Sequence, residues 1–231
     1  HPDCESIGNF NLTGSTGSNI QKHRPTLSGG RNFFDGWSAT DEFFEMPKSR
    51  PADTNRFKTW KPKEQYLVEG RFTTEVKSWV IAPVLRHFDE IIVHRGMPIP
   101  PYNQVGLDDY YHTIRTDMGL NLDRDFKKAK FTTIFAYNQF QRNKNTYVKD
   151  LTDLTQTLSE ALGAQDTALF SLINLRSSYI YQFGEKFSLE SGIDLNYETA
   201  FGIRIEGQEK DQGDYAAYLT AEWKALKNLQ L

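Results

Sequence analysis

The stretch Phe187–Ile205 reads FSLESGIDLNYETAFGIRI, and it decides the fold. Its odd positions carry no charge and are mostly apolar, whereas its even positions include Glu190, Asp194 and Glu198. Successive side chains of a β-strand point to opposite faces, so this period of two predicts one long strand with an apolar face and a polar face. A helix would instead distribute the carboxylates around all of its faces.

Five further segments repeat the alternation, each with an apolar row and a polar row: 64–74, 108–122, 128–141, 168–183 and 214–224. The pattern is weaker in 128–141, where Ile134 and Phe140 interrupt the polar row. Near the N-terminus, residues 9–20 and 25–34 are expected to form a hairpin around a turn at 21–24. Together these segments predict a sheet of about ten strands.

The connections between these segments alternate in length. Short polar turns are expected at 123–125, 184–186 and 224–228, and long loops at 35–62, 96–107, 142–167 and 206–213. Short turns at one rim and long loops at the other are typical of an up-and-down meander in an outer membrane.

The segment Lys77–Arg95 (KSWVIAPVLRHFDEIIVHR) does not fit the pattern. It shows no clean alternation, and Pro83 lacks the N–H that a strand ladder needs. An irregular strand with a bulge and a short helix are both compatible with it. The up-and-down count favours a strand.

Strand length indicates the kind of sheet. Strands of soluble proteins usually run about 3–10 residues, whereas a bilayer is crossed by about 9–11 tilted residues. The nineteen residues of Phe187–Ile205 would form a strand roughly 60 Å long. Such a strand is longer than a membrane is thick, so it would project beyond the membrane on the long-loop side. We therefore predict an all-β fold, an antiparallel up-and-down transmembrane β-barrel. A soluble β-sandwich with unusually long hairpins remains the alternative.

The composition is compatible with a barrel, excludes membrane-spanning helices and gives no support for nucleic-acid binding. With 25% charged residues and a mean hydropathy of -0.60, the chain has no run of about 18 apolar residues for a membrane helix. A formal net charge of -3 gives no electrostatic reason to expect nucleic acid as a partner. Aromatic residues near the strand ends are expected to form two interfacial girdles. The expected members are Phe183, Phe187 and Trp223 beside short turns, and Tyr110, Tyr111 and Tyr215 beside long loops.

No enzymatic motif is present, whether Walker A, G-x-G-x-x-G, H-E-x-x-H or G-x-S-x-G. The carboxylates Glu190, Asp194 and Glu198 are expected to line a wet lumen. Their expected ion-pair partners are Arg115, Arg176 and Arg204. Possible metal ligands are Asp123 with Asp125 and Asp211 with Asp214 for calcium, His94 and His112 for haem iron, and His1 with Cys4 for zinc. None forms a sufficient set, so we expect no enzyme, no cofactor and no metal site.

Four short motifs lie beside these strands: Arg31–Trp37 (RNFFDGW), Trp60–Tyr66 (WKPKEQY), Tyr147–Leu151 (YVKDL) and Ile205–Tyr215 (IEGQEKDQGDY). With the strand pattern, they resemble TonB-dependent receptors of the kind found in Bacteroidota-type bacteria. The resemblance spans most of the chain, from about residue 25 to residue 231.

The resemblance implies an integral protein of the bacterial outer membrane, in which a barrel of about 22 strands encloses a plug. Such receptors import scarce nutrients, such as ferric siderophores, haem or cobalamin, with energy delivered through TonB. No plug, TonB-interacting segment or signal peptide is recognisable, so residues 1–231 are expected to form one partial β-barrel domain from within a larger barrel. The implied partners are the TonB system, the lipid bilayer and a small-molecule or metal-chelate ligand.

In such a receptor the ligand would contact the long loops and the upper lumen. Aromatic and cationic residues there suit stacking on, or pairing with, an anionic chelate. The candidates are Trp60, Tyr102, Tyr110, Tyr111 and Arg142. Two other functions remain open: a passive porin-type channel and a soluble β-rich binding module.

Overall fold

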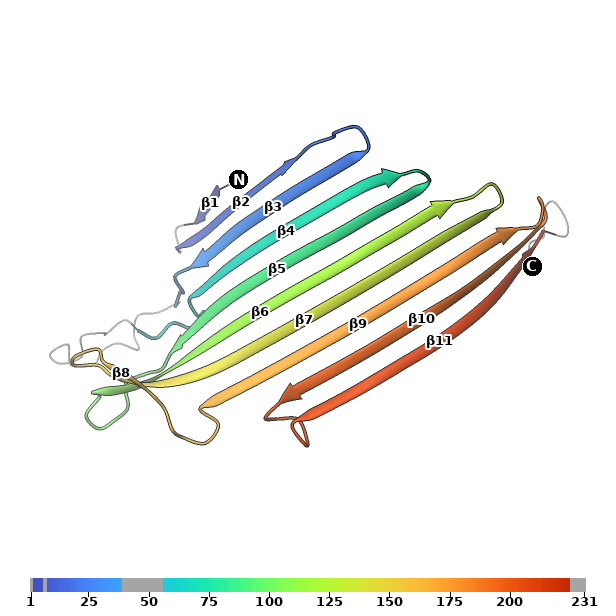
Figure 1. Cartoon of the computed structure of the whole chain (residues 1–231). Coiled ribbons are helices and arrows are strands. Elements are labelled where there is room, and N and C mark those ends of the chain that lie inside the picture. Colours follow the sequence, from blue (N-terminus) through green and yellow to red (C-terminus); the bar gives the residue numbers. More distant parts are fainter. Residues whose placement is uncertain (1, 6–7, 39–55, 225–231) are drawn as a thin grey trace.

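The structure, a computed structural model, describes residues 2–5, 8–38 and 56–224. It is a single sheet in which every pairing is antiparallel, and ten strands follow one another across it in chain order (Figure 1). They are β1 (Pro2–Glu5), β2 (Asn9–Gly17), β3 (His23–Phe34), β4 (Lys63–Val76), β5 (Trp79–Arg95), β6 (Val105–Asp125), β7 (Ala129–Asp150), β9 (Gln165–Gln182), β10 (Phe187–Gly202) and β11 (Glu209–Trp223). The short strand β8 (Gln156–Leu158) lies off this path and pairs with β7. The all-β, up-and-down architecture predicted from the sequence is confirmed.

The two ends of the sheet are β1 and β11. No pairing among the described residues joins these strands, so the sheet is open (Figure 1). The predicted N-terminal hairpin is present as β2 and β3. In the part of the chain that the structure describes, no helix is long and apolar enough to cross a membrane.

The strands are much longer than those of ordinary soluble sheets. The longest are β6 with 21 residues and β7 with 22, and a strand of that length reaches roughly 70 Å. Their pairing is continuous from Val105↔Asp150 at the long-loop end to Asp125↔Lys130 at the short turn. Each strand is therefore held along its full length by its neighbours.

The hydrogen-bonded rows run obliquely to the rim formed by the short turns. One row passes through Leu27, Gly70, Met118 and Ile173. These residues lie 5, 7, 9 and 12 residues from their hairpin tips at Lys22, Lys77, Lys127 and Glu185. From one hairpin to the next the distance grows by two or three residues, and each hairpin contains two strands, so the offset is about one residue per strand. With a rise of about 3.3 Å per residue and a spacing of about 4.8 Å between strands, this offset corresponds to a strand tilt of about 35°.

The segment Lys77–Arg95 consists of a turn and a regular strand. Lys77, with a φ of 57°, and Ser78 form the tip of the β4–β5 hairpin. The strand β5 then runs to Arg95, so the strand interpretation is confirmed and no helix forms. Pairing with β4 skips two residue pairs at Pro83 and resumes in the same register. The gap falls there because proline cannot donate to the ladder.

Two of the predicted long loops are wrong in extent. Strand β7 continues to Asp150, so only residues 151–164 connect it to β9, and they include β8. Strand β11 begins at Glu209, which leaves residues 203–208 between β10 and β11 instead of a loop at 206–213. Most of the loop 35–62 and of the turn 224–228 lies outside the described residues.

Candidate functional site

One face of the sheet is apolar and largely uncovered. The stretch that decided the fold forms β10 and ends at Gly202, three residues before the predicted end of the strand. Within β10 the odd side chains lie on this face, where Phe187, Ile193 and Tyr197 each remain 39% exposed. The buried hydrophobic residues of the described chain are only Ala129, Leu151 and Ala164. A soluble domain hides most of its large apolar side chains in a core, and the described residues contain no such core.

The total accessible surface leads to the same conclusion. The chain exposes 16137 Å², whereas a compact monomer of 26.6 kDa would expose about 10,700 Å². The β-sandwich alternative requires a second layer over the apolar face, and the described residues provide none.

The apolar character of this face is concentrated in the half of the sheet next to the short turns. From the turn outward, β7 places on it Phe131, Thr133, Phe135, Tyr137, Gln139, Gln141 and Asn143. The change to polar residues also occurs on β6, where His112 lies 2.9 Å from Asp89 of β5. The apolar band thus occupies roughly the 9–11 residues that a tilted strand needs to cross a bilayer.

Aromatic rings border this band at the short turns. Arg124 lies over the rings of Trp79, at 5.0 Å, and Phe126, at 4.4 Å. Phe183 contacts Phe187 with ring centroids 5.4 Å apart. Of this aromatic belt, Phe183 and Phe187 were predicted at this rim together with Trp223, which pairs with Phe187 across β10 and β11. Trp79 and Phe126 were not predicted.

The girdle predicted at the long loops is only partly formed. Tyr110 lies on the apolar face, edge-on to Tyr147 at 5.4 Å, and Tyr215 is 69% exposed on the same face. Tyr111 lies on the opposite face, under Arg142. It is not a girdle member, because consecutive residues of a strand point to opposite sides.

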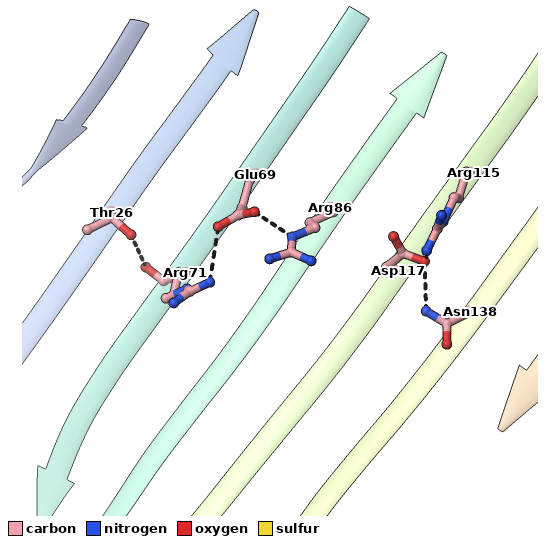
Figure 2. Close-up of polar contacts among 7 residues, drawn as sticks. All are labelled: Thr26, Glu69, Arg71, Arg86, Arg115, Asp117 and Asn138. Carbon is pink, nitrogen blue, oxygen red and sulfur yellow. Dashed lines mark hydrogen bonds and ion pairs between the residues drawn. The ribbon is translucent and has the colours of Figure 1, made fainter. Parts of the chain in front are cut away.

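The polar face carries a ladder of charged residues that extends from strand to strand. Figure 2 shows Glu69 of β4 between two guanidinium groups, that of Arg71 at 3.3 Å and that of Arg86 on β5. The hydroxyl of Thr26 on β3 donates to the Arg71 carbonyl oxygen at 3.5 Å. Three adjacent strands are thereby connected through side chains as well as through backbone pairing.

A second group lies on β6 and β7. Asp117 accepts hydrogen bonds from Arg115 at 3.0 Å and from Asn138 at 2.7 Å (Figure 2). Further along, Arg176 of β9 donates through Nε to Asp194 of β10 at 2.9 Å. Positive and negative groups alternate across this face, as suits a surface in contact with water.

The ion pairs predicted from the sequence are right in one case of three. Arg176 pairs with Asp194 as predicted. Arg115 pairs with Asp117 on its own strand, and Arg204 pairs with Asp166 at 2.8 Å. Which charged residues form ion pairs depends on strand register and on side-chain rotamers. Neither can be deduced from the fact that the residues lie on the same face of the sheet.

A row of apolar side chains also crosses the polar face, and the sequence analysis missed it. The row joins Leu67, Phe88, Phe140, Phe170 and Ala200, with Arg115 between Phe88 and Phe140. The rings of Phe140 and Phe170 lie 6.1 Å apart. Beside them is a cavity of about 620 Å³, bordered by the charged residues Arg115, Glu198, Lys210 and Asp211. The sequence did contain one sign of this apolar row. Phe140 is an apolar residue on the polar side of segment 128–141, and the sequence analysis treated it only as an interruption of the alternation.

The five predicted ligand-contact residues do not form one site. Tyr111 and Arg142 come together on the polar face, with the guanidinium 4.8 Å from the ring centre. Trp60 stacks on Trp37 at 4.7 Å, and Tyr102 is 78% exposed in the loop after β5. Tyr110 faces the other side of the sheet. Only the Tyr111–Arg142 pair has the arrangement of a contact site.

The long-loop rim contains a buried ion pair that sequence reasoning also missed. Arg56 and Asp108 are both fully buried and paired with each other. Gly106 makes room for the guanidinium, because a Cβ there would lie 1.9 Å from Arg56 Nη1. Nearby, the Lys61 ammonium lies 4.1 Å from the ring centre of Phe57, and burial lowers the pKa of this ammonium group.

The candidate metal ligands do not assemble into a centre. Across residues 2–5, 8–38 and 56–224, no group of three or more His, Cys, Asp or Glu side chains is placed to hold a metal ion. Asp123 instead accepts a hydrogen bond from Thr132 at 2.9 Å. His1 and the side chain of Cys4 lie outside the described part of the chain.

Comparison with solved structures identifies the kind of fold. BauA, the ferric preacinetobactin receptor from Acinetobacter baumannii, matches 99% of this chain with a TM-score of 0.53 and 10% sequence identity. The chain shares its fold with part of that receptor. FyuA, the ferric yersiniabactin uptake receptor from Yersinia pestis, matches 96% of the chain with a TM-score of 0.47 and 8% identity.

The chain spans 40% of the BauA chain and 36% of the FyuA chain. No family model and no curated protein matches the sequence. At 10% identity the likeness to BauA concerns the fold alone.

Proposed function

We propose that this chain forms part of the wall of a large outer-membrane β-barrel receptor of about 22 strands. The observation that carries the proposal is the uncovered apolar band on one face of a sheet whose other face is a ladder of charges. Hydrocarbon would cover the first face and water would wet the second. Further strands would pair with the open edges at β1 and β11, because an unpaired strand edge cannot face lipid.

The receptor would take up a small-molecule metal chelate, such as a ferric siderophore, and its energy would come from the TonB system. BauA, a ferric-chelate receptor by name, shares the fold. Tyr111 and Arg142 offer an aromatic face and a cation at the long-loop end, where an anionic chelate would enter. The process would be binding followed by passage through the lumen, without covalent chemistry.

The test of the membrane assignment uses the full-length protein that contains this chain. An outer-membrane barrel should remain in the membrane fraction after carbonate extraction, and it should migrate differently on a gel before and after boiling. A protein that leaves the membrane in carbonate and migrates identically in both states would be a soluble β-rich module instead.

The charged ladder also suits a passive porin-type channel, because such a channel has a water-filled lumen. Conductance across a planar bilayer separates the two functions. A receptor that encloses a plug should stay closed, whereas a porin should conduct steadily. Steady conductance by the full-length protein would replace the receptor proposal with the channel.

A further inference from the structure

Each short turn of the sheet carries lysine at its tip or directly beside it. These tip lysines are Lys22 between β2 and β3, Lys77 between β4 and β5, Lys127 and Lys128 between β6 and β7, and Lys186, next to Glu185, between β9 and β10. All five side chains are exposed. In the part of the chain that the structure describes, none of the five has an ion-pair partner. Lysine thus recurs on four hairpins, and the net positive charge is concentrated at the β2–β3 and β6–β7 turns, because Glu75 and Glu185 offset Lys77 and Lys186.

The charge balance of this rim is opposite to that of the chain. Segments 18–24, 75–78, 123–130, 182–188 and 222–224 contain nine Lys and Arg and five Asp and Glu, a net charge of +4. The whole chain has a formal net charge of -3. Some of the rim acids are already engaged, since Glu75 pairs with Arg24 and Glu222 with Lys224, each at 3.5 Å.

The aromatic belt indicates the level at which these lysines lie. Trp79, Phe126 and Phe183 lie within a few residues of the tips. Aromatic side chains of membrane proteins gather at the boundary between hydrocarbon and headgroups. The tips project beyond the belt, so their ammonium groups lie at headgroup level. Arg124, held over two of the rings, adds a guanidinium at the belt itself.

We propose that the short-turn rim binds the anionic headgroups of glycerophospholipids in the leaflet that surrounds it. The inference rests on the membrane location proposed above. Lysine binds phosphate as a compact, mobile point charge, and the spacing of the tips along the rim suits a row of separate headgroups better than one compact ligand. Each lysine near an anionic surface strengthens binding about five-fold.

The test is the lipid preference of the full-length protein in neutral detergent, titrated with phosphatidylglycerol or with phosphatidylcholine of the same acyl chains. Native mass spectrometry then counts the bound lipids. The variant Lys77→Gln, Lys127→Gln, Lys186→Gln removes three tip charges without altering the apolar band. We expect the wild-type protein to prefer phosphatidylglycerol and the variant to lose about five-fold of that preference per lysine.

The matched control is Lys63→Gln, Lys149→Gln, Lys210→Gln, which removes the same charge away from the short turns. It should keep the wild-type preference. Equal losses in both variants, or no preference in the wild-type protein, would overturn the inference. If the protein remains heat-modifiable and membrane-bound in these cases, the receptor proposal stands and only the lipid site fails. Release into carbonate would reject both.

Discussion

Gly106 has no side chain, and this leaves room for a buried ion pair that stabilises the long-loop rim. Its open position admits the guanidinium of Arg56, which pairs with Asp108 at a fully buried site. Burial of a charge is costly unless it is paired. The Arg56–Asp108 pair therefore fixes the segment that leads into β4 against the start of β6.

The substitution Gly106→Ala should loosen this rim. The added Cβ would lie 1.9 Å from Arg56 Nη1, so the arginine must move. Overpacking of this kind typically costs about 1–3 kcal/mol. Faster hydrogen exchange is expected at the Leu151 amide, which donates to the Gln104 carbonyl at 2.7 Å in the same rim.

Gly14→Ala is the matched control, because nothing lies within 4 Å of a Cβ at that position. It should leave the exchange rate of the Leu151 amide unchanged. If Gly106→Ala behaves like Gly14→Ala, the buried pair does not hold the rim.

At the level of the strand, the assignment of faces can be tested with two neighbouring residues of β7. Phe135 lies in the apolar band between Leu120 and Leu175, and Ala136 lies on the polar face between Gly119 and Asn174. Phe135→Arg should lower the stability of the protein in lipid vesicles by about 2–4 kcal/mol, the cost of a lipid-facing arginine near the bilayer centre. Urea unfolding from vesicles measures this loss.

The control is Ala136→Arg, which places the same charge on the wet face, between Gly119 and Asn174. We expect at most a small change in the urea midpoint. Equal destabilisation by the two arginines would mean that Phe135 does not face lipid.

The sequence was most informative where hydrocarbon would cover one face of a strand, because contact with lipid enforces a period of two. Residues 187–197 show this alternation, and their apolar row lies on the uncovered face. The same reasoning failed for 142–150 and 209–213. These strand ends lie beyond the apolar band, so both of their faces can be polar, and they are ordered by pairing with neighbours.

The candidate site was harder to predict for a related reason. Side-chain chemistry alone suggested five ligand contacts, yet the fold brings together only Tyr111 and Arg142. Which aromatic residues meet depends on strand register, as for Phe140 and Phe170, which lie directly opposite each other on β7 and β9. Register follows from pairing between segments and is not contained in any one of them.

Across the whole sheet, the strand register does not give the depth at which a residue would lie in the membrane. The offset of about one residue per strand tilts the strands by about 35°, close to the tilt of about 35–45° in outer-membrane barrels. Residues of one hydrogen-bonded row should therefore lie at different depths. Residues equally distant from their hairpin tips should lie at the same depth.

Spin labels on single cysteines, with Cys4 replaced by serine, can measure this tilt in a bilayer. Gly70 and Ile173 share a row but lie 7 and 12 residues from their tips, so their labels should differ in depth by about 13 Å. Gly70 and Leu120 lie on different rows, each 7 residues from its tip, and their labels should lie at equal depth. A cysteine at Gly70 meets no atom within 4 Å. Equal depths for positions 70 and 173 would mean that the strands stand upright in the membrane, which would contradict the barrel geometry proposed here.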